Sequence, residues 1–338
     1  MVKFLVIRFS SIGDIVLTTP VVRGLHEQVS HAEVHYLTRK EYAGLLRDNP
    51  HIQKIHILSE RQDETIKALK KEGFDYVIDL QNNLRSLMIK RSLKRMYFTV
   101  SKLNVRKWIL VNLKINKMPD RHIVDRYMDT VQLFDVQDDQ QGLDHFIPVG
   151  ERISLSSLPD EFQRGYVVMA IGAKHITKKM TPGQLQELAG ALHLPVVIIG
   201  GKEDRPVGEQ IVAAHPGQPI LNGCGEWNLN QSASVIEQAA CVITHDTGMM
   251  HLAAAFRKKI ITIWGNTLPA LGMYPYRSDK ASVSFEVEGL RCRPCSKLGK
   301  KACPKKHFRC MLDHDLQKIA DTANRLSSSV NYDSGIDR

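Results

Sequence analysis

The sequence has no apolar run near the roughly 20 residues that a membrane-spanning helix needs, which excludes an integral helical membrane protein. Cysteine is scarce, at 6 residues among 338, and this excludes a small disulfide-stapled scaffold. Aromatic residues are only 7% of the chain. A hydrophobic content of 43% with 24% charged residues excludes extensive disorder and predicts a folded protein, with two domains as the prior for this length.

Two windows of the chain lack acidic residues altogether. The first, Leu80–Pro119, holds ten Lys and Arg residues, and the second, Gly289–Cys310, holds eight. Outside these windows the 28 remaining bases are outnumbered by all 36 acids of the chain. The windows therefore predict an anionic partner, which by charge alone could be nucleic acid, a membrane surface or a phosphorylated substrate.

Strand-like and helix-like stretches alternate along the chain, which predicts an α/β protein with parallel sheets. The run KFLVIR, residues 3–8, predicts a first buried strand rather than a signal peptide, so we expect a cytoplasmic protein. A Pro- and Ser-containing stretch at about 137–164 predicts a connector. We therefore expect domains at 1–150 and 151–328 and a flexible tail at 329–338. Ligands should bind at the carboxyl ends of the strands, in the cleft between the domains.

The motif ITHDTGMMHLAAAF, residues 243–256, predicts a strand that turns into a helix at Asp246, Thr247 and Gly248. Backbone N–H groups at such a helix start, with the positive end of the helix dipole, favour a phosphate group. Gly248 permits close approach of the backbone, and His251 follows one turn into the helix. The alternative is that Asp246 only caps the helix and His251 is a surface residue.

The motif FSSIGD, residues 9–14, directly follows the first strand. Its turn delivers Asp14 to the start of the next helix, at the carboxyl edge of the predicted sheet. A carboxylate in that place could act as a general base toward a substrate hydroxyl. The alternative is again a helix-capping aspartate.

A basic loop follows the first strand of the second half, in the segment AIGAKHITKKMTP, residues 170–182. Lys174, Lys178 and Lys179 precede a helix start there, where lysines can neutralise a diphosphate leaving group. The segment IIGGKED repeats the order of strand, glycine and charge one unit later, and its Glu203 could reach a nucleotide ribose. The alternatives are a solvated loop and a helix that begins at Glu203.

Together these blocks resemble glycosyltransferase family nine, the ADP-heptose:lipopolysaccharide heptosyltransferases. The resemblance rests on VIRFSSIGDIVLTTPVVRGL, YVIDLQNNLRS, THDTGMMHLAAAF and ITIWGNT, in this order. It implies a GT-B fold of two Rossmann-like domains, with the acceptor on the first and a nucleotide-sugar donor on the second. It also implies an inverting, metal-independent glycosyltransferase that moves a sugar, in this family heptose from ADP-heptose, to a lipopolysaccharide core or related glycolipid.

On the donor side, the resemblance implies a set of binding residues from both motifs of the second half. The family's lysine falls at Lys179, but Met180 stands where the family has tryptophan, so Lys178 stays open as the diphosphate ligand. The implied donor residues are Lys178, Lys179, Glu203, Asp246, Thr247, Gly248 and His251.

On the acceptor side, the resemblance implies that Asp14 deprotonates the acceptor hydroxyl and that Ser11 and Gly13 of the same turn bind the acceptor. The first basic window follows the YVIDLQNNLRS block, where the family meets a phosphate-bearing lipid. We therefore expect Arg85 to touch an anionic glycolipid, and the window to contact the cytoplasmic face of the inner membrane peripherally. Only Tyr97, Phe98 and Trp108 are aromatic in this window, which argues against nucleic acid.

Four of the six cysteines lie within nineteen residues of the second window. In a reducing cytosol their spacing is compatible with a structural Zn²⁺ site, with His307 as an alternative ligand. Some family members carry a similar segment, and reduced thiols or redox-dependent bridges are the alternatives. The four residues are Cys292, Cys295, Cys303 and Cys310.

Two other functions compete with sugar transfer. A nucleotide-sugar epimerase or an enzyme with another donor could use the same fold without a large acceptor. A non-catalytic protein could bind anionic surfaces through the basic windows. Epimerases do not usually carry the SxxGD block opposite the donor site, so sugar transfer is the preferred interpretation.

Overall fold

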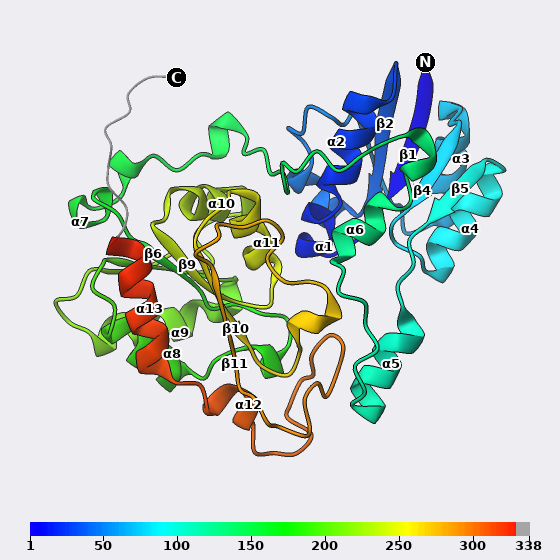
Figure 1. Ribbon diagram of the computed structural model, residues 1–338. Coiled ribbons are helices and arrows are strands. Elements are labelled where there is room, and N and C mark those ends of the chain that lie inside the picture. Colours follow the sequence, from blue (N-terminus) through cyan, green and yellow to red (C-terminus); the bar gives the residue numbers. More distant parts are fainter. Residues whose placement is uncertain (329–338) are drawn as a thin grey trace. The chain divides into compact units, whose positions relative to one another are not determined.

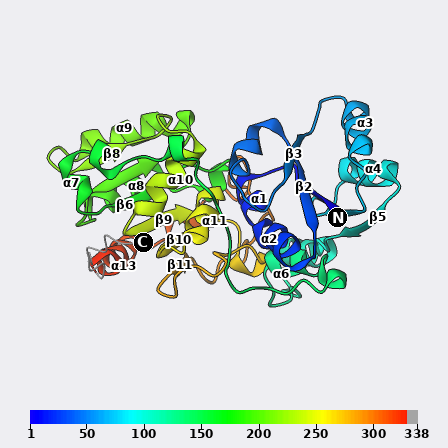
Figure 2. The same ribbon diagram turned by 90° about the horizontal axis from the view of Figure 1, so that it is seen from above.

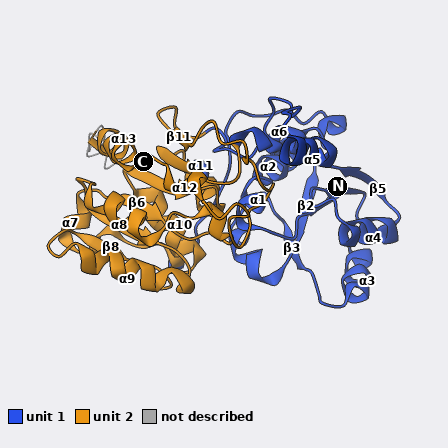
Figure 3. Cartoon of the chain, turned by 90° about the horizontal axis from the view of Figure 1, so that it is seen from below, with its two compact units in different colours: residues 1–150, 254–256, 269–277 blue, residues 151–253, 257–268, 278–338 orange. Residues whose placement is uncertain are grey.

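The computed structural model describes residues 1–328, so the predicted tail at 329–338 lies outside the described residues. The chain divides into two compact units (Figure 3). The first contains residues 1–150 with the short segments 254–256 and 269–277, and the second contains 151–253, 257–268 and 278–328. The alternation of strands and helices did not predict that these two short segments belong to the first unit. The longer segment contains only a short 3-10 helix and loop residues.

A five-stranded parallel sheet forms the centre of the first unit, in the order β3-β2-β1-β4-β5 (Figure 1). Residues 4–7 of β1 are fully buried, as expected for a parallel strand covered on both faces. The order of the strands reverses at β1, so the carboxyl end of β1 is a topological switch point. The strands are β1 (Val2–Ile7), β2 (Ala32–Thr38), β3 (Lys54–Ile57), β4 (Tyr76–Asp79) and β5 (Met96–Thr99).

The helices of the first unit include a break that the sequence pattern did not predict. The sequence from Ile15 to Val29 predicts one helix bent near Pro20, but the structure has two helices, and the first begins within FSSIGD. The hydroxyl of Thr18 donates to the Ile15 carbonyl at 2.6 Å, and Pro20 in the next turn has no N–H to continue the ladder. The helices are α1 (Ile12–Val16), α2 (Thr19–Gln28), α3 (Gln62–Glu72), α4 (Leu84–Leu93), α5 (Asn104–Leu113) and α6 (Ile123–Met128).

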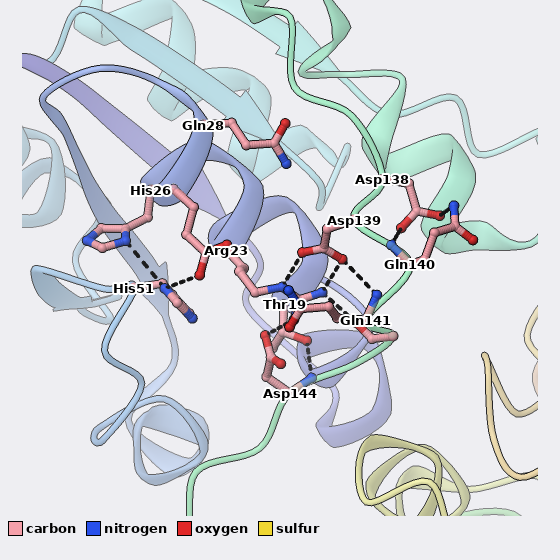
Figure 4. A network of polar contacts seen from close by, with 12 residues as sticks. Thr19, Arg23, His26, Gln28, His51, Asp138, Asp139, Gln140, Gln141 and Asp144 are labelled. Atoms are coloured by element: carbon pink, nitrogen blue, oxygen red, sulfur yellow. Dashed lines mark hydrogen bonds and ion pairs between the residues drawn. The ribbon is translucent and has the colours of Figure 1, made fainter.

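A buried arginine of α2, Arg23, fastens the start of the connector to the first unit (Figure 4). Its side chain is 2% exposed, and its Nε and Nη2 donate to the carboxylate of Asp139 at 2.6 and 2.9 Å. It also pairs with Asp144 and donates to the Gly142 carbonyl at 2.9 Å. The acidic segment DDQQG is therefore held in place by one guanidinium that satisfies two carboxylates.

The second unit holds a six-stranded parallel sheet in the order β11-β10-β9-β6-β7-β8. Its order reverses between β6 and β9, which makes the carboxyl ends of these strands the second switch point. The strands are β6 (Val167–Ala170), β7 (Val196–Ile199), β8 (Ile220–Asn222), β9 (Cys241–His245), β10 (Ile260–Trp264) and β11 (Val283–Glu286). The helices are α7 (Asp160–Gln163), α8 (Pro182–Gly190), α9 (Arg205–Ala214), α10 (Leu229–Gln238), α11 (Gly248–Ala255), α12 (Arg309–Leu312) and α13 (Leu316–Ser328).

Local features of the sequence explain where two helices of the second unit begin. Thr181 caps α8, since its hydroxyl accepts from the Gln184 N–H at 3.3 Å, and Pro182 is the first residue of that helix. Helix α11 begins at Gly248, directly after the turn at Asp246. Within residues 1–328, no helix combines the length and the apolar character needed to cross a bilayer.

Candidate active site

Asp14 occupies the third position of α1, at the carboxyl end of β1. Its Oδ2 accepts from the backbone N–H of Ser11 at 3.2 Å and from the Ser11 hydroxyl at 2.9 Å. Its Oδ1 lies 2.5 Å from Nη2 of Arg8, and 23% of the side chain is exposed. Gly13, predicted beside it, is buried in the same short helix. Asp14 thus makes a capping contact with Ser11 and still presents its carboxylate to solutes.

Arg8 organises this end of the sheet, although the sequence reasoning did not single it out. It is 7% exposed, and its Nη1 donates to the Leu80 carbonyl at 2.7 Å and to the Tyr127 hydroxyl at 3.1 Å. Burial alone would lower the pKa of Arg8, but Asp14 and the neighbouring phenols more than offset this and raise it. The guanidinium therefore stays charged and orients the carboxylate of Asp14. The sequence did contain a signal for this role, because Arg8 is a charged residue directly after an apolar strand.

The block YVIDLQNNLRS meets FSSIGD at this edge of the first sheet. The side-chain oxygen of Gln81 accepts from the backbone N–H of Phe9 at 2.9 Å. Asn83 caps α4 by accepting from the Ser86 N–H at 2.9 Å. Arg85, predicted to touch the acceptor, lies in the first turn of α4 with an exposed side chain.

One base of the first window cannot serve an external anion. Lys90 is 3% exposed, and its Nζ contacts Oδ2 of Asp79 at 2.8 Å and the hydroxyl of Thr99 at 2.6 Å. Asp79 is fully buried and also accepts from the Ser86 hydroxyl at 2.9 Å. The charge pattern of the sequence included Lys90 among the bases available to an anionic partner. The pattern does not show that Asp79, one residue before the window, is the buried partner of Lys90.

In the second sheet, Lys178 and Asp246 come from the ends of the neighbouring strands β6 and β9. Nζ of Lys178 lies 2.6 Å from Oδ2 of Asp246 and donates to its backbone carbonyl at 3.0 Å. The hydroxyl of Thr267, which follows β10, donates to the same Oδ2 at 2.7 Å. Three adjacent parallel strands therefore deliver a cation, a carboxylate and a hydroxyl to one edge of the sheet, at its switch point.

The remaining residues of the DTG motif lie at the start of α11. Thr247 and Gly248 are half-buried, and the Thr247 hydroxyl lies 3.4 Å from that of Thr244. His251 is 3% exposed, so the interpretation of this histidine as a surface residue is wrong. The preceding His245 is also buried, accepts from the Met180 N–H at 3.0 Å, and has its pKa lowered to about 3, chiefly by burial.

The adjacent lysine, Lys179, turns to a different carboxylate. It forms an ion pair with Asp204, which is 2% exposed and also accepts from the Gly201 N–H at 3.0 Å. Asp204 packs so closely on Gly172 that a Cβ there would lie 2.6 Å from its Oδ2. Glu203, predicted near the ribose, is exposed one residue earlier. The sequence reasoning considered only Glu203 of the two acids in IIGGKED and so missed Asp204.

Comparison with known proteins identifies the family of this chain. The model of glycosyltransferase family 9 (heptosyltransferase) matches residues 64–306, more than half of the chain. The chain belongs to glycosyltransferase family 9. It is 27% identical over 312 residues to lipooligosaccharide heptosyltransferase 2 of Haemophilus influenzae, covering 85% of this chain and 89% of that protein.

Two solved structures show the fold. The ADP-heptose LPS heptosyltransferase II of E. coli matches with a TM-score of 0.72 and 20% identity, over 96% of this chain and 98% of that one. The iron-containing dodecameric glycosyltransferase TibC of E. coli matches with a TM-score of 0.58 and 13% identity, over 97% and 77% of the two chains. The family, the GT-B fold and the assignment as a glycosyltransferase, all predicted from the sequence, are confirmed.

In this family 9 enzyme, the second basic window attaches to Thr177, next to Lys178, and to Thr267, whose hydroxyl contacts Asp246. The Lys300 N–H donates to the Thr177 hydroxyl at 2.8 Å, and its carbonyl accepts from the Thr177 N–H at 3.2 Å. Nη2 of Arg293 donates to the carbonyl of Thr267 at 2.8 Å. The window therefore braces the loops that follow β6 and β10, a role that its charge did not suggest.

The cysteines of this window lie in a partly buried segment. Burial raises the pKa of Cys310 to about 11, and it also raises that of Cys295. Sγ of Cys292 lies 3.7 Å from Nε2 of His307. Within residues 1–328, however, no three of these groups bring ligand atoms within 4.8 Å of one another. The thiolate chemistry and spacing fit a soft metal ion, and the four sulfurs would have to draw together around it.

Proposed function

We propose that this glycosyltransferase moves heptose from ADP-heptose to a lipopolysaccharide core or a related anionic glycolipid, with inversion at the anomeric carbon. The observation that carries the proposal is the Lys178–Asp246 pair beside the start of α11, at the switch point of the second sheet. A helix start with an adjacent lysine suits a diphosphate, and a carboxylate next to it suits a sugar hydroxyl. The names of the relatives supply heptose, ADP and the lipid acceptor.

On the donor side, we assign the diphosphate to Lys178 and to the backbone of Thr247 and Gly248. Lys178 shares Asp246 with Thr267, so it can move to a phosphate while the hydroxyl of Thr267 stays on the carboxylate. Lys179 is engaged by buried Asp204, which favours a positioning role for it. Glu203 is exposed at the end of β7, where it would meet the ribose, and His251 supports the diphosphate segment from inside α11.

On the acceptor side, Asp14 would take the proton of the acceptor hydroxyl, with Ser11 and Gly13 in the same turn and Arg85 on an acceptor phosphate. The acceptor oxygen attacks the anomeric carbon from the face opposite the nucleotide, and the bond from that carbon to the diphosphate oxygen breaks. The charge that develops on the departing ADP meets Lys178 and the helix start. The proton transfers to Asp14 as the new bond makes the hydroxyl acidic, while Arg8 holds the carboxylate in place.

A donor screen tests this function. ADP-sugars should raise the melting temperature, by the equivalent of about 2.7 kcal/mol at a hundredfold excess over Kd, whereas GDP- and UDP-sugars should not. Mass spectrometry should then show heptose added to a heptose-deficient lipopolysaccharide core. Conversion of the nucleotide sugar without an acceptor would indicate an epimerase instead, and binding without any product would indicate a non-catalytic protein.

We also propose that α5 brings the enzyme to the cytoplasmic face of the inner membrane. This helix projects from the sheet of the first unit (Figure 1) and lies in the acid-free window. Trp108 is 58% exposed and Val105 72% exposed, next to the exposed base Arg106. An exposed tryptophan among bases suits the boundary of an anionic lipid layer, where the ring enters the interface and the bases meet headgroups.

Vesicle sedimentation tests this contact. The double variant Arg106→Gln/Lys117→Gln should bind anionic vesicles roughly 30-fold more weakly, at about 1 kcal/mol for each base near an anionic surface. Adding salt should also weaken the binding of the wild type to anionic vesicles, because salt screens the charges. The matched control Lys70→Gln/Lys71→Gln alters two exposed bases of α3 and should bind normally. Equal binding to neutral vesicles would refute the proposal.

For the four cysteines of the second window, we propose a structural metal ion, of the Zn²⁺ or iron type. Thiolates are the ligands that such ions prefer, and the TibC relative is iron-containing. Protein purified without chelator should carry about one ion per chain in this segment, and Cys292→Ser/Cys303→Ser should lose that ion. Because the window braces Thr177 and Thr267, we expect that variant also to bind ADP more weakly. The proposal would be wrong if wild-type protein purified without chelator contained no metal, if its four window thiols reacted freely, and if it still bound ADP with normal affinity.

A further inference from the structure

A second group of metal-ligand side chains lies in the first unit, separate from Asp14 and from the cysteines. His35 is in β2, His56 is in β3 and Glu72 ends α3, three elements labelled in Figure 2. Nδ1 of His35 lies 3.0 Å from Nε2 of His56 and 4.0 Å from Oε2 of Glu72. Of all residues from 1 to 328, only these three bring at least three such ligand atoms within 4.8 Å of one another. We infer that they bind a divalent transition-metal ion of the Zn²⁺ type.

The sheet register places both imidazoles on the same side. In the parallel pair of β2 and β3, His56 lies beside Leu37, which is two residues after His35. Residues two apart in a strand share a face, so the rings of His35 and His56 point the same way. Phe74 packs edge-on against both rings, at centroid distances of 5.1 and 5.9 Å. The rings are therefore held in place before any ion binds.

The distances between the ligand atoms suit a small tetrahedral ion. Four ligands at about 2.1 Å from Zn²⁺ stand roughly 3.4 Å apart. The observed separations of 3.0 and 4.0 Å lie on either side of that value. Two histidines and a glutamate are also a ligand set that Zn²⁺ uses with a water in the fourth position. Since the Glu72 side chain is 21% exposed, an ion can reach the group from solvent.

The neighbouring Lys54 leaves one oxygen of Glu72 available for an ion. Lys54 lowers the pKa of Glu72 by a hydrogen bond to Oε1 at 2.6 Å, which leaves Oε2 facing His35. Lys54 can thus keep its contact while the other oxygen binds an ion.

A further carboxylate stands behind His35. Oε2 of Glu33 lies 3.9 Å from Nε2 of His35, on the side away from the group, and it pairs with Lys3 at 3.2 Å. Metal-binding histidines commonly turn their second ring nitrogen to a carboxylate, which fixes the tautomer and strengthens the ligand. With its proton on Nε2, His35 accepts at Nδ1 from Nε2 of His56, and that hydrogen must move to Nδ1 of His56 for both rings to bind the ion.

Titration of the full-length chain with Co²⁺ and Zn²⁺ tests the site. Nitrogen and oxygen ligation gives weak visible Co²⁺ bands, whereas the cysteine segment would add intense thiolate charge-transfer absorption, so the two sites are distinguishable. His56→Gln and Glu72→Gln should each weaken the non-thiolate site at least tenfold, a scale that even outer-shell partners reach. The thiolate signal should stay unchanged.

Glu64→Gln, which alters the same residue type in the first turn of α3, is the matched control and should leave Zn²⁺ affinity unchanged. Zn²⁺ should also raise the melting temperature of the wild type more than that of His56→Gln, because the ion ties β2, β3 and α3 together. Equal non-thiolate binding in the wild type, His56→Gln and Glu72→Gln would overturn the inference. So would the lack of any such binding by the wild type. Neither result bears on sugar transfer, which can be assayed on the same proteins.

Discussion

Asp14→Asn should lower kcat by about 10²–10⁴-fold, because the amide cannot accept the proton of the acceptor hydroxyl. The affinity for ADP, measured by calorimetry, should stay near that of the wild type, since no donor contact is assigned to Asp14. The amide oxygen can still accept from Ser11, so the turn should keep its shape. Single-turnover kinetics with saturating donor and acceptor would isolate the chemical step from product release.

The same substitution removes the counter-ion of Arg8, so a loss of activity could come either from the missing base or from a displaced Arg8. Arg8 keeps its bonds to the Leu80 carbonyl and the Tyr127 hydroxyl, so the fold should survive with a lower melting temperature. Ser11→Ala is the appropriate comparison, because it removes a hydrogen bond to Asp14 and leaves the carboxylate. It should retain most of kcat. A kcat of Asp14→Asn close to that of Ser11→Ala would show that Asp14 is not the base.

The strands that the sequence predicted well are the central ones. β1, β6 and β9 are buried on both faces, and a continuous apolar run is the direct signature of such a strand. The strands that it missed, β5, β8 and β11, are edge strands of three or four residues with exposed or half-exposed side chains. A short half-exposed strand is held by its neighbour in the sheet, and single-sequence patterns do not record that neighbour.

In the candidate site, the sequence likewise predicted where the residues lie along the chain but not which residues they contact. The motifs with Asp14, Lys178 and Asp246 could be placed at the ends of strands, because a polar turn after an apolar run is a local feature. Their partners are distant in sequence, since Lys178 and Asp246 are 68 residues apart. Nor could local pattern choose between Lys178 and Lys179, which are adjacent and of one residue type. The choice depends on buried Asp204, whose burial only the fold reveals.

Substitution of the two lysines should therefore affect different properties: Lys178 the activity, and Lys179 the stability. Lys178→Met should lower kcat/KM by about 10²–10³-fold, the scale of removing one donor to a developing charge, and should weaken ADP binding. Its cost in stability should be small, because Asp246 keeps the hydroxyl of Thr267. Lys179→Met should instead lower the free energy of unfolding by about 3–5 kcal/mol, because it leaves the carboxylate of Asp204 buried without its cation. Chemical denaturation and steady-state kinetics on both variants would separate these effects.

A second substitution distinguishes charge from packing at Asp204. If the cost of Lys179→Met is an uncompensated buried charge, then Asp204→Asn on that background should recover much of the lost stability. The amide oxygen can still accept from the Gly201 N–H, so the contact that shapes the loop after β7 would remain. Turnover of the folded double variant should then approach that of the wild type, because Lys178 is intact. A double variant with restored stability but absent ADP binding would transfer the diphosphate role to Lys179. In that case Lys179 would have to leave Asp204 when the donor binds.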